Sequence, residues 1–128
     1  MSDPRRPLVL IVEDEESLAE LLRVNLEAAG YSVLVAPNGV EGLDLFRSSQ
    51  PDLVTLDLKL PDVSGFRLLD LFKRDTKHSP MVIVVTSLDY AEAGEAIRSG
   101  ADDFMTKPFE PAELIERIQY LLQKRSAD

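Results

Sequence analysis

The feature of this sequence that most restricts its fold is a fivefold alternation of short apolar runs with segments of helical periodicity. The apolar runs are too short for helices and are therefore predicted to be buried strands. The predicted strands are residues 8–12, 31–36, 52–57, 81–85 and 103–106. The predicted helices run from about Glu15 to Ala29, over residues 39–49, 66–73 and 90–99, and from Pro111 to about residue 124.

Such an alternation indicates an α/β fold, a doubly wound five-stranded parallel sheet with helices on both faces. Right-handed crossovers place the carboxyl ends of all five strands on one edge of the sheet. Four of the predicted strands end in polar residues: Glu13 and Asp14 after the first, Asp57 at the third, Thr86 after the fourth and Lys107 after the fifth.

Three carboxylates on one edge repel each other until a cation joins them. The chain has no cysteine, so the ligands are hard oxygens, which select Mg²⁺, Mn²⁺ or Ca²⁺, and few carboxylates with room for water favour Mg²⁺. A hydroxyl from Thr86 and an ammonium from Lys107 would complete a pocket for a tetrahedral dianion. This set of groups predicts phosphoryl transfer with Asp57 as the nucleophile.

Composition narrows the classes of protein further. The formal net charge of −9 argues against a nucleic-acid-binding surface, which needs a basic footprint. No apolar run is long enough to cross a membrane, and nothing indicates an oxidising compartment. We expect a cytoplasmic domain over residues 7–124, with flexible tails at residues 1–6 and 125–128, and His78 exposed and without a catalytic role.

Four segments, in this order, resemble the response-regulator receiver domains of two-component signalling. They are Leu10–Glu15 (LIVEDE), Leu56–Asp62 followed by Gly65, Val85–Ser87 (VTS) and Gly100–Phe109 (GADDFMTKPF). Each motif is weak alone, but four in order at strand ends are highly specific. The resemblance covers about residues 7–124 and implies a flavodoxin-like (βα)₅ fold with strand order 2-1-3-4-5.

By that resemblance, Asp57 accepts a phosphoryl group from a sensor histidine kinase or a phosphotransfer protein, with Mg²⁺ (or Mn²⁺) as cofactor. Asp14 would bind the metal directly, Glu13 through water, and Lys59 through its backbone carbonyl. The protein would be a signalling switch, not an enzyme with an external substrate.

The resemblance also assigns residues around this centre. Thr86 and Lys107 would hold phosphoryl oxygens, Thr86 and Phe104 would form the switch pair, and Lys107–Pro108 would be a cis peptide. Lys59 and Leu88 would flank the path of attacking water and slow autodephosphorylation.

The partner surfaces implied by the resemblance lie on two sides. The kinase would dock on Leu18, Leu22, Pro108 and Phe109, although some of these leucines must be core, since the helix buries one stripe. An unknown effector or output domain would respond to the face of the fourth helix, fifth strand and fifth helix. We expect a monomer or a weak phosphorylation-dependent homodimer. The fourth helix, shortened and interrupted by Gly94, is predicted to be the least stable part of the fold.

Taken singly, the site residues also have purely structural interpretations: Thr86 could cap a strand, Lys107 could be a surface base and Phe104 could be plain core.

Two other functions fit parts of the pattern. A degenerate receiver would act as a constitutive protein-interaction module that takes no phosphate. A phosphohydrolase of the haloacid-dehalogenase type also uses an aspartyl nucleophile, but it carries a second acid two residues later, where this chain has Lys59.

Overall fold

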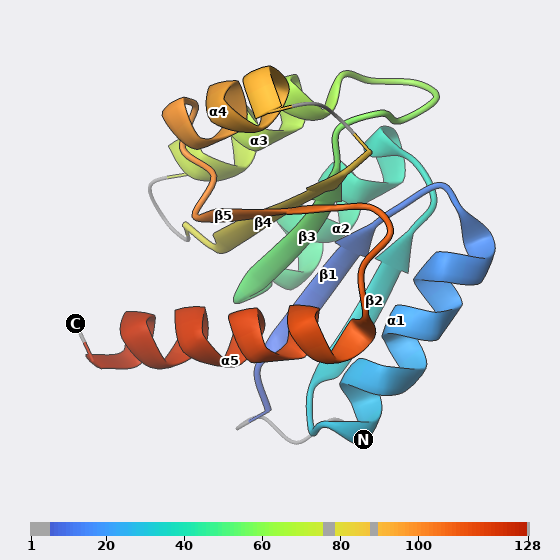
Figure 1. The fold of residues 1–128 in the computed structure, drawn as a ribbon, viewed down its shortest axis with the longest axis vertical. Helices are drawn as coiled ribbons and strands as arrows, with labels where there is room; N and C mark the ends of the chain where they lie inside the picture. The colour runs from blue at the N-terminus through green and yellow to red at the C-terminus, as the bar shows by residue number, and fades with distance from the viewer. Residues whose placement is uncertain (1–5, 76–78, 88–89, 128) are drawn as a thin grey trace.

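The apolar runs form a single sheet, and the predicted α/β fold class and strand order are both confirmed. The computed structural model describes residues 6–75, 79–87 and 90–127. All strand pairs are parallel, in the order β2-β1-β3-β4-β5, and helices pack on both faces (Figure 1). The strands are β1 (Leu8–Val12), β2 (Ser32–Ala36), β3 (Leu53–Asp57), β4 (Met81–Thr86) and β5 (Asp103–Thr106). The helices are α1 (Glu16–Ala28), α2 (Gly39–Ser49), α3 (Gly65–Arg74), α4 (Tyr90–Arg98) and α5 (Pro111–Ala127).

The sheet separates the core into two layers, because successive side chains of a strand point to opposite faces. In β1, Leu10 and Val12 join the layer under α2, α3 and α4, whereas Val9 and Ile11 join the layer under α1 and α5. All four side chains are buried. Burial on both faces explains why the central strands are continuous apolar runs rather than alternating ones.

Several element boundaries differ from the sequence prediction by one to three residues. Tyr31 precedes β2, because its N–H donates to the Leu26 carbonyl at the end of α1 (3.1 Å). Gly65 is the first residue of α3 rather than part of the preceding loop. Helix α5 continues to Ala127, so residues 125–127 are helical rather than a tail; Arg125 Nη1 donates to the Asp52 carbonyl at 2.7 Å, which holds the last turns against the sheet.

The buried side chains described for helix α4 are small. Its buried side chains include Ala93 and Ala96, whereas Ile97 is 42% exposed. Gly94 lies in its interior, and Gly100, with φ of +111°, follows its end in a conformation that favours glycine.

We expect the amides of α4 to exchange with solvent faster than those of α1, α2, α3 and α5, since two alanines bury little apolar area. Phosphorylation should slow this exchange. Hydrogen exchange with and without a phosphate mimic provides the measurement. Uniformly slow exchange across all five helices would contradict the prediction.

The sequence predictions for His78, for Leu88 and for residues 1–5 of the N-terminal tail fall outside the described residues. Among the helices that the structure describes, none combines the length and apolar composition that a bilayer crossing requires.

Candidate phosphoryl-transfer site

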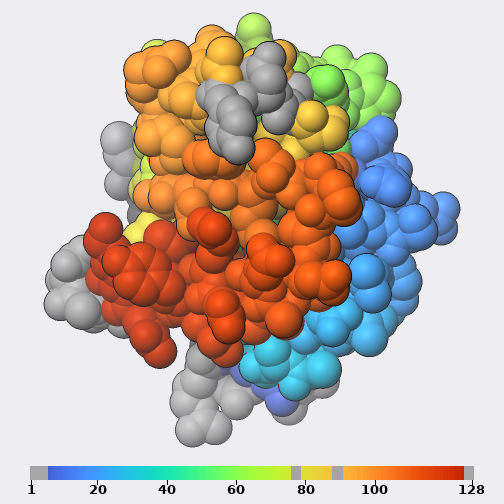
Figure 2. Space-filling model, in the orientation of Figure 1, coloured from blue at the N-terminus to red at the C-terminus, as the bar shows by residue number. Residues whose placement is uncertain are grey.

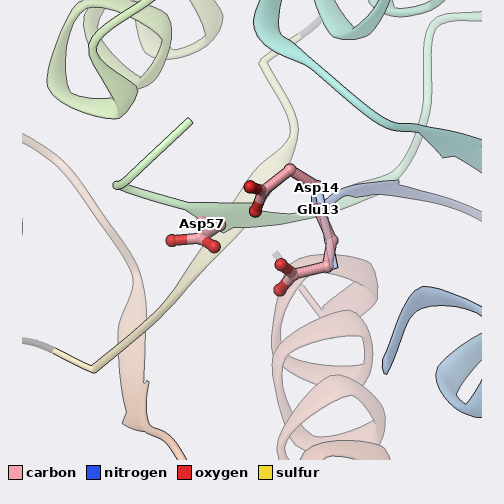
Figure 3. Close-up of side chains that lie close together, drawn as sticks. All are labelled: Glu13, Asp14 and Asp57. Atoms are coloured by element: carbon pink, nitrogen blue, oxygen red, sulfur yellow. The ribbon is translucent and has the colours of Figure 1, made fainter. Parts of the chain in front are cut away.

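Three carboxylates meet at the carboxyl edge of the sheet, where β1 and β3 are direct neighbours. Val12 pairs with Leu56 in register, so the residues that follow them emerge side by side. Glu13, Asp14 and Asp57 each offer an oxygen, and these oxygens lie within 4.8 Å of one another (Figure 3).

The three carboxylates differ in exposure. Glu13 and Asp57 are only 3% and 5% exposed, whereas Asp14 faces solvent. The cluster is therefore open to water and ligands on the side of Asp14 and enclosed by the fold on the side of the other two.

Lys107 brings a positive charge into this cluster from the end of β5. Its Nζ lies 2.8 Å from Glu13 Oε1 and 3.1 Å from Asp57 Oδ2. Its backbone N–H donates to the Thr86 carbonyl (2.8 Å), and the Lys107–Pro108 peptide bond is cis. The lysine thus bridges acids from two different strands.

Burial and this ion pairing shift two pKa values. Burial raises the pKa of Glu13 from 4.5 to about 7, and the charge of Asp57 adds to the rise, although hydrogen bonds from Lys107 and from the Glu15 N–H oppose it. For Lys107, burial lowers the pKa, but hydrogen bonds to Glu13 and Asp57 outweigh it, so its pKa is raised. Lys107 therefore carries its charge at neutral pH.

The two residues predicted to form a switch lie on adjacent strands. Thr86 is fully buried at the end of β4 and pairs in register with Thr106. Phe104 pairs with Val84, two residues before Thr86, and packs partly buried against the layer under α2, α3 and α4. The structure thus places Phe104 near Thr86 on the sheet, next to the helix that follows Thr86.

Lys59 lies on the loop between β3 and α3, and its backbone approaches Asp57. Its N–H donates to Asp57 Oδ1 at 2.9 Å, and it forms an isolated bridge with Ser64. Its side chain is exposed. Leu88, predicted to act beside Lys59, lies outside the described residues.

Asp62 is a residue that the sequence analysis did not single out. It belongs to the same loop as Lys59, but both of its carboxylate oxygens accept hydrogen bonds from the start of α2, at Gly39 and Val40. The partners are more than twenty positions away in the chain, so no local sequence signal reveals the contact.

This donor set fits a small hard cation. The converging side chains of Glu13, Asp14 and Asp57 are carboxylates, few enough to leave coordination positions for water and for a phosphate oxygen, as Mg²⁺ requires. The Lys107 ammonium beside Asp57 adds a group that can neutralise an incoming anion. The arrangement can therefore support attack by a carboxylate oxygen on phosphorus, with charge neutralisation from two sides.

Comparisons with known proteins agree with this geometry. The family model described as "Response regulator receiver domain" matches residues 9–119. Among curated proteins, the chain is 38% identical over 120 residues to the DNA-binding dual master transcriptional regulator RpaA of Synechocystis, covering 92% of this chain and 50% of that relative. It is 34% identical over 116 residues to the alkaline phosphatase synthesis transcriptional regulatory protein PhoP of Bacillus subtilis, covering 91% and 48%.

Solved structures of receiver domains also match this chain. The signal receiver domain of a putative Luxo repressor protein from Vibrio parahaemolyticus matches with a TM-score of 0.89 and 32% identity, over 95% of this chain and 94% of that one. The BeF3-activated DrrB receiver domain matches with a TM-score of 0.84 and 28% identity, over 92% and 98%. The chain spans about half the length of the curated relatives it matches. By its fold, its motifs and these relationships, the chain belongs to the response regulator receiver domain family.

Proposed function

We propose that this domain is a phosphoacceptor switch whose acceptor is Asp57. The observation that carries the proposal is the contact of Lys107 Nζ with Asp57 Oδ2 at 3.1 Å, beside two further carboxylates from β1. A structural ion pair needs no such cluster of like charges, whereas a phosphoryl-transfer site needs both the acids for a metal and the cation for the phosphate.

In the proposed reaction, an oxygen of the ionised Asp57 carboxylate attacks the phosphorus of a phosphohistidine on the partner. A P–O bond to Asp57 forms and the P–N bond breaks; its electron pair stays on the histidine nitrogen, which takes up a proton from water. Lys107 exchanges part of its pairing with Asp57 for the phosphoryl oxygens. Thr86 donates its hydroxyl to another phosphoryl oxygen, which couples its position to that of Phe104.

Glu13, Asp14, Asp57 and the backbone carbonyl of Lys59 are the proposed groups for holding Mg²⁺. When bound, the ion neutralises charge on the phosphoryl oxygens during transfer. Glu13, whose pKa is raised to about 7 by burial, must give up its proton for this.

Incubation with acetyl phosphate and Mg²⁺ tests the proposal. We expect one base-labile phosphoryl group per chain, and none in Asp57→Asn, because the amide is a poor nucleophile. Absence of an adduct in the wild type would support the degenerate-receiver alternative. Many turnovers of acetyl phosphate per chain would instead support a phosphohydrolase.

We further propose that the phosphoryl donor docks over a hollow beside Lys107. This hollow of about 330 Å³ is lined by Glu15, Leu18, Lys107, Pro108 and Phe109. The sequence analysis expected part of this leucine set to be core, and Leu22 is that part, because it is 2% exposed. Helical spacing identifies an apolar stripe but does not tell which of its edges faces solvent.

Replacing Leu18 by lysine should reduce phosphoryl transfer from the cognate kinase at least about tenfold, the equivalent of ~1.4 kcal/mol of docking energy. Labelling by acetyl phosphate should persist, because the small donor needs no docking surface. Val40→Lys is a matched control: Val40 is an exposed apolar residue on α2, away from the hollow. If Leu18→Lys loses both reactions, the substitution has disturbed folding and the docking site is not supported.

The output of the switch is proposed to pass through the surface formed by α4, β5 and α5. These elements occupy most of the face seen in Figure 2, and Phe104 lies on β5. RpaA is named as a DNA-binding regulator, so we propose that this surface controls a DNA-binding output domain or an equivalent effector. Because this chain has a net charge of −9, we assign any contact with DNA to that output domain.

A further inference from the structure

Asp62 makes a two-pronged contact that no part of the proposed reaction explains. Its Oδ1 accepts the N–H of Gly39 at 2.8 Å and its Oδ2 accepts the N–H of Val40 at 2.9 Å. These hydrogen bonds lower the pKa of Asp62, the one from Val40 more than the one from Gly39, so the carboxylate is ionised at neutral pH. A negative charge at the amino end of α2 also complements the helix dipole.

Helix α2 already has its own cap, so the helix does not depend on Asp62 alone. The side-chain oxygen of Asn38 accepts the N–H of Glu41 at 2.9 Å. Asp62 satisfies the two N–H groups before Glu41 from a different loop. The contact therefore joins two segments of the chain. Besides capping α2, it holds the loop after β3 in place.

That loop is held at three points. At its base, the Gly65 N–H donates to the Leu58 carbonyl (3.1 Å), and a Cβ on Gly65 would lie 2.4 Å from Leu58 Cα, so the loop ends touch. Above the base, Lys59 bridges to Ser64. The third point is Asp62. Among the hydrogen bonds described for the outer part of the loop, only those of Asp62 connect it to another helix, α2.

The packing around Gly39 supports a fixed junction. A Cβ on Gly39 would lie 2.9 Å from Val63 Cβ and 3.1 Å from Asp62 Oδ1. The start of α2 and the loop therefore meet closely, with backbone N–H groups directed at the carboxylate. Because Lys59 lies on this loop and donates its N–H to Asp57 Oδ1, a displacement of the loop would also displace a contact of the acceptor carboxylate.

We infer that Asp62 is a positioning residue for the metal and phosphoryl site: by clamping the loop to α2, it fixes the backbone of Lys59 beside Asp57. The inference rests on the proposed function, in which the Lys59 carbonyl is a metal ligand. Asp62 itself touches neither the metal ligands nor the transferred group; it acts through the loop.

The test compares Asp62→Ala with Asn38→Ala, two substitutions that each remove side-chain acceptors from the first turn of α2. Calorimetric titration with Mg²⁺ should show about tenfold weaker binding in Asp62→Ala, the scale at which outer-shell partners affect metal sites. Asn38→Ala, which leaves the loop attached, should keep the wild-type affinity. Asp62→Asn keeps one acceptor oxygen and should lie between Asp62→Ala and wild type.

Amide exchange without metal gives a second readout that a helix cap would not change. The Lys59 N–H should exchange faster in Asp62→Ala than in wild type or in Asn38→Ala. Equal Mg²⁺ affinity and equal Lys59 exchange in the two alanine variants would overturn the inference, as would equal weakening in both. If wild-type protein binds no Mg²⁺, the proposed function fails instead, and the exchange rate of Lys59 still decides whether Asp62 fixes the loop.

Discussion

Magnesium at about a hundred times its dissociation constant should stabilise the wild-type domain by about 2.7 kcal/mol, which for a chain of this length raises Tm by about 10 °C. The physical reason is that the ion binds only where Glu13, Asp14 and Asp57 are held together, and the unfolded chain does not hold them so. Thermal melts over a series of Mg²⁺ concentrations provide the measurement.

Asp14→Asn is the control for this expectation. The substitution removes the exposed member of the cluster without opening the core, so the protein should fold and its Tm should respond weakly to Mg²⁺. A wild-type Tm that stays flat at millimolar Mg²⁺ would contradict the metal site.

The stability of the metal-free domain should fall as pH rises from about 4.5 to about 7, because of Glu13. Its pKa is 4.5 in the unfolded chain and about 7 in the fold, so the folded state holds the proton more tightly. The stabilisation is fully present below pH 4.5 and is lost as pH passes the folded value. The contribution is about 3 kcal/mol. Lys107, whose pKa is raised above 10.5, acts only at alkaline pH.

Glu13→Gln should remove this part of the pH dependence, because the amide does not ionise. Urea unfolding at several pH values between 4 and 8 measures it, with Glu16→Gln, which removes an exposed acid of α1, as the control that should keep the wild-type slope. Saturating Mg²⁺ should also flatten the slope, since a cation favours the ionised carboxylate. Identical slopes in wild type and Glu13→Gln would contradict the assignment.

The strands could be predicted from the sequence because their signal is local. A run such as Leu8–Val12 is apolar at every position since both faces of the sheet are covered, and the polar residue that follows marks the edge. The grouping of Glu13, Asp14 and Asp57 followed from that edge rule. The contact of Lys107 with both buried acids could not be predicted, because the sequence shows only which strand the lysine follows.

Other features depend on contacts across the fold and leave little local trace. Gly65 is typical of a loop in sequence, yet it starts α3 because the absence of a side chain lets it lie against Leu58. Leu22 and Leu18 both fit the helical stripe of α1, and only the packed structure shows that the former is core. The contact of Asp62 with Gly39 joins two distant segments, and no sequence motif of either segment indicates the pairing.

The two-layered core has a consequence for how such domains diversify. Leu18 and Phe109 pack against the layer of α1 and α5, whereas Phe104 packs against the layer of α2, α3 and α4. The sheet backbone lies between them, so substitutions in one layer leave packing in the other largely unchanged, as distant sites do. A lineage could therefore alter the proposed donor contacts at Leu18 and Phe109 while keeping the packing around Phe104, and gene duplication could yield new signalling routes without redesign of the whole domain.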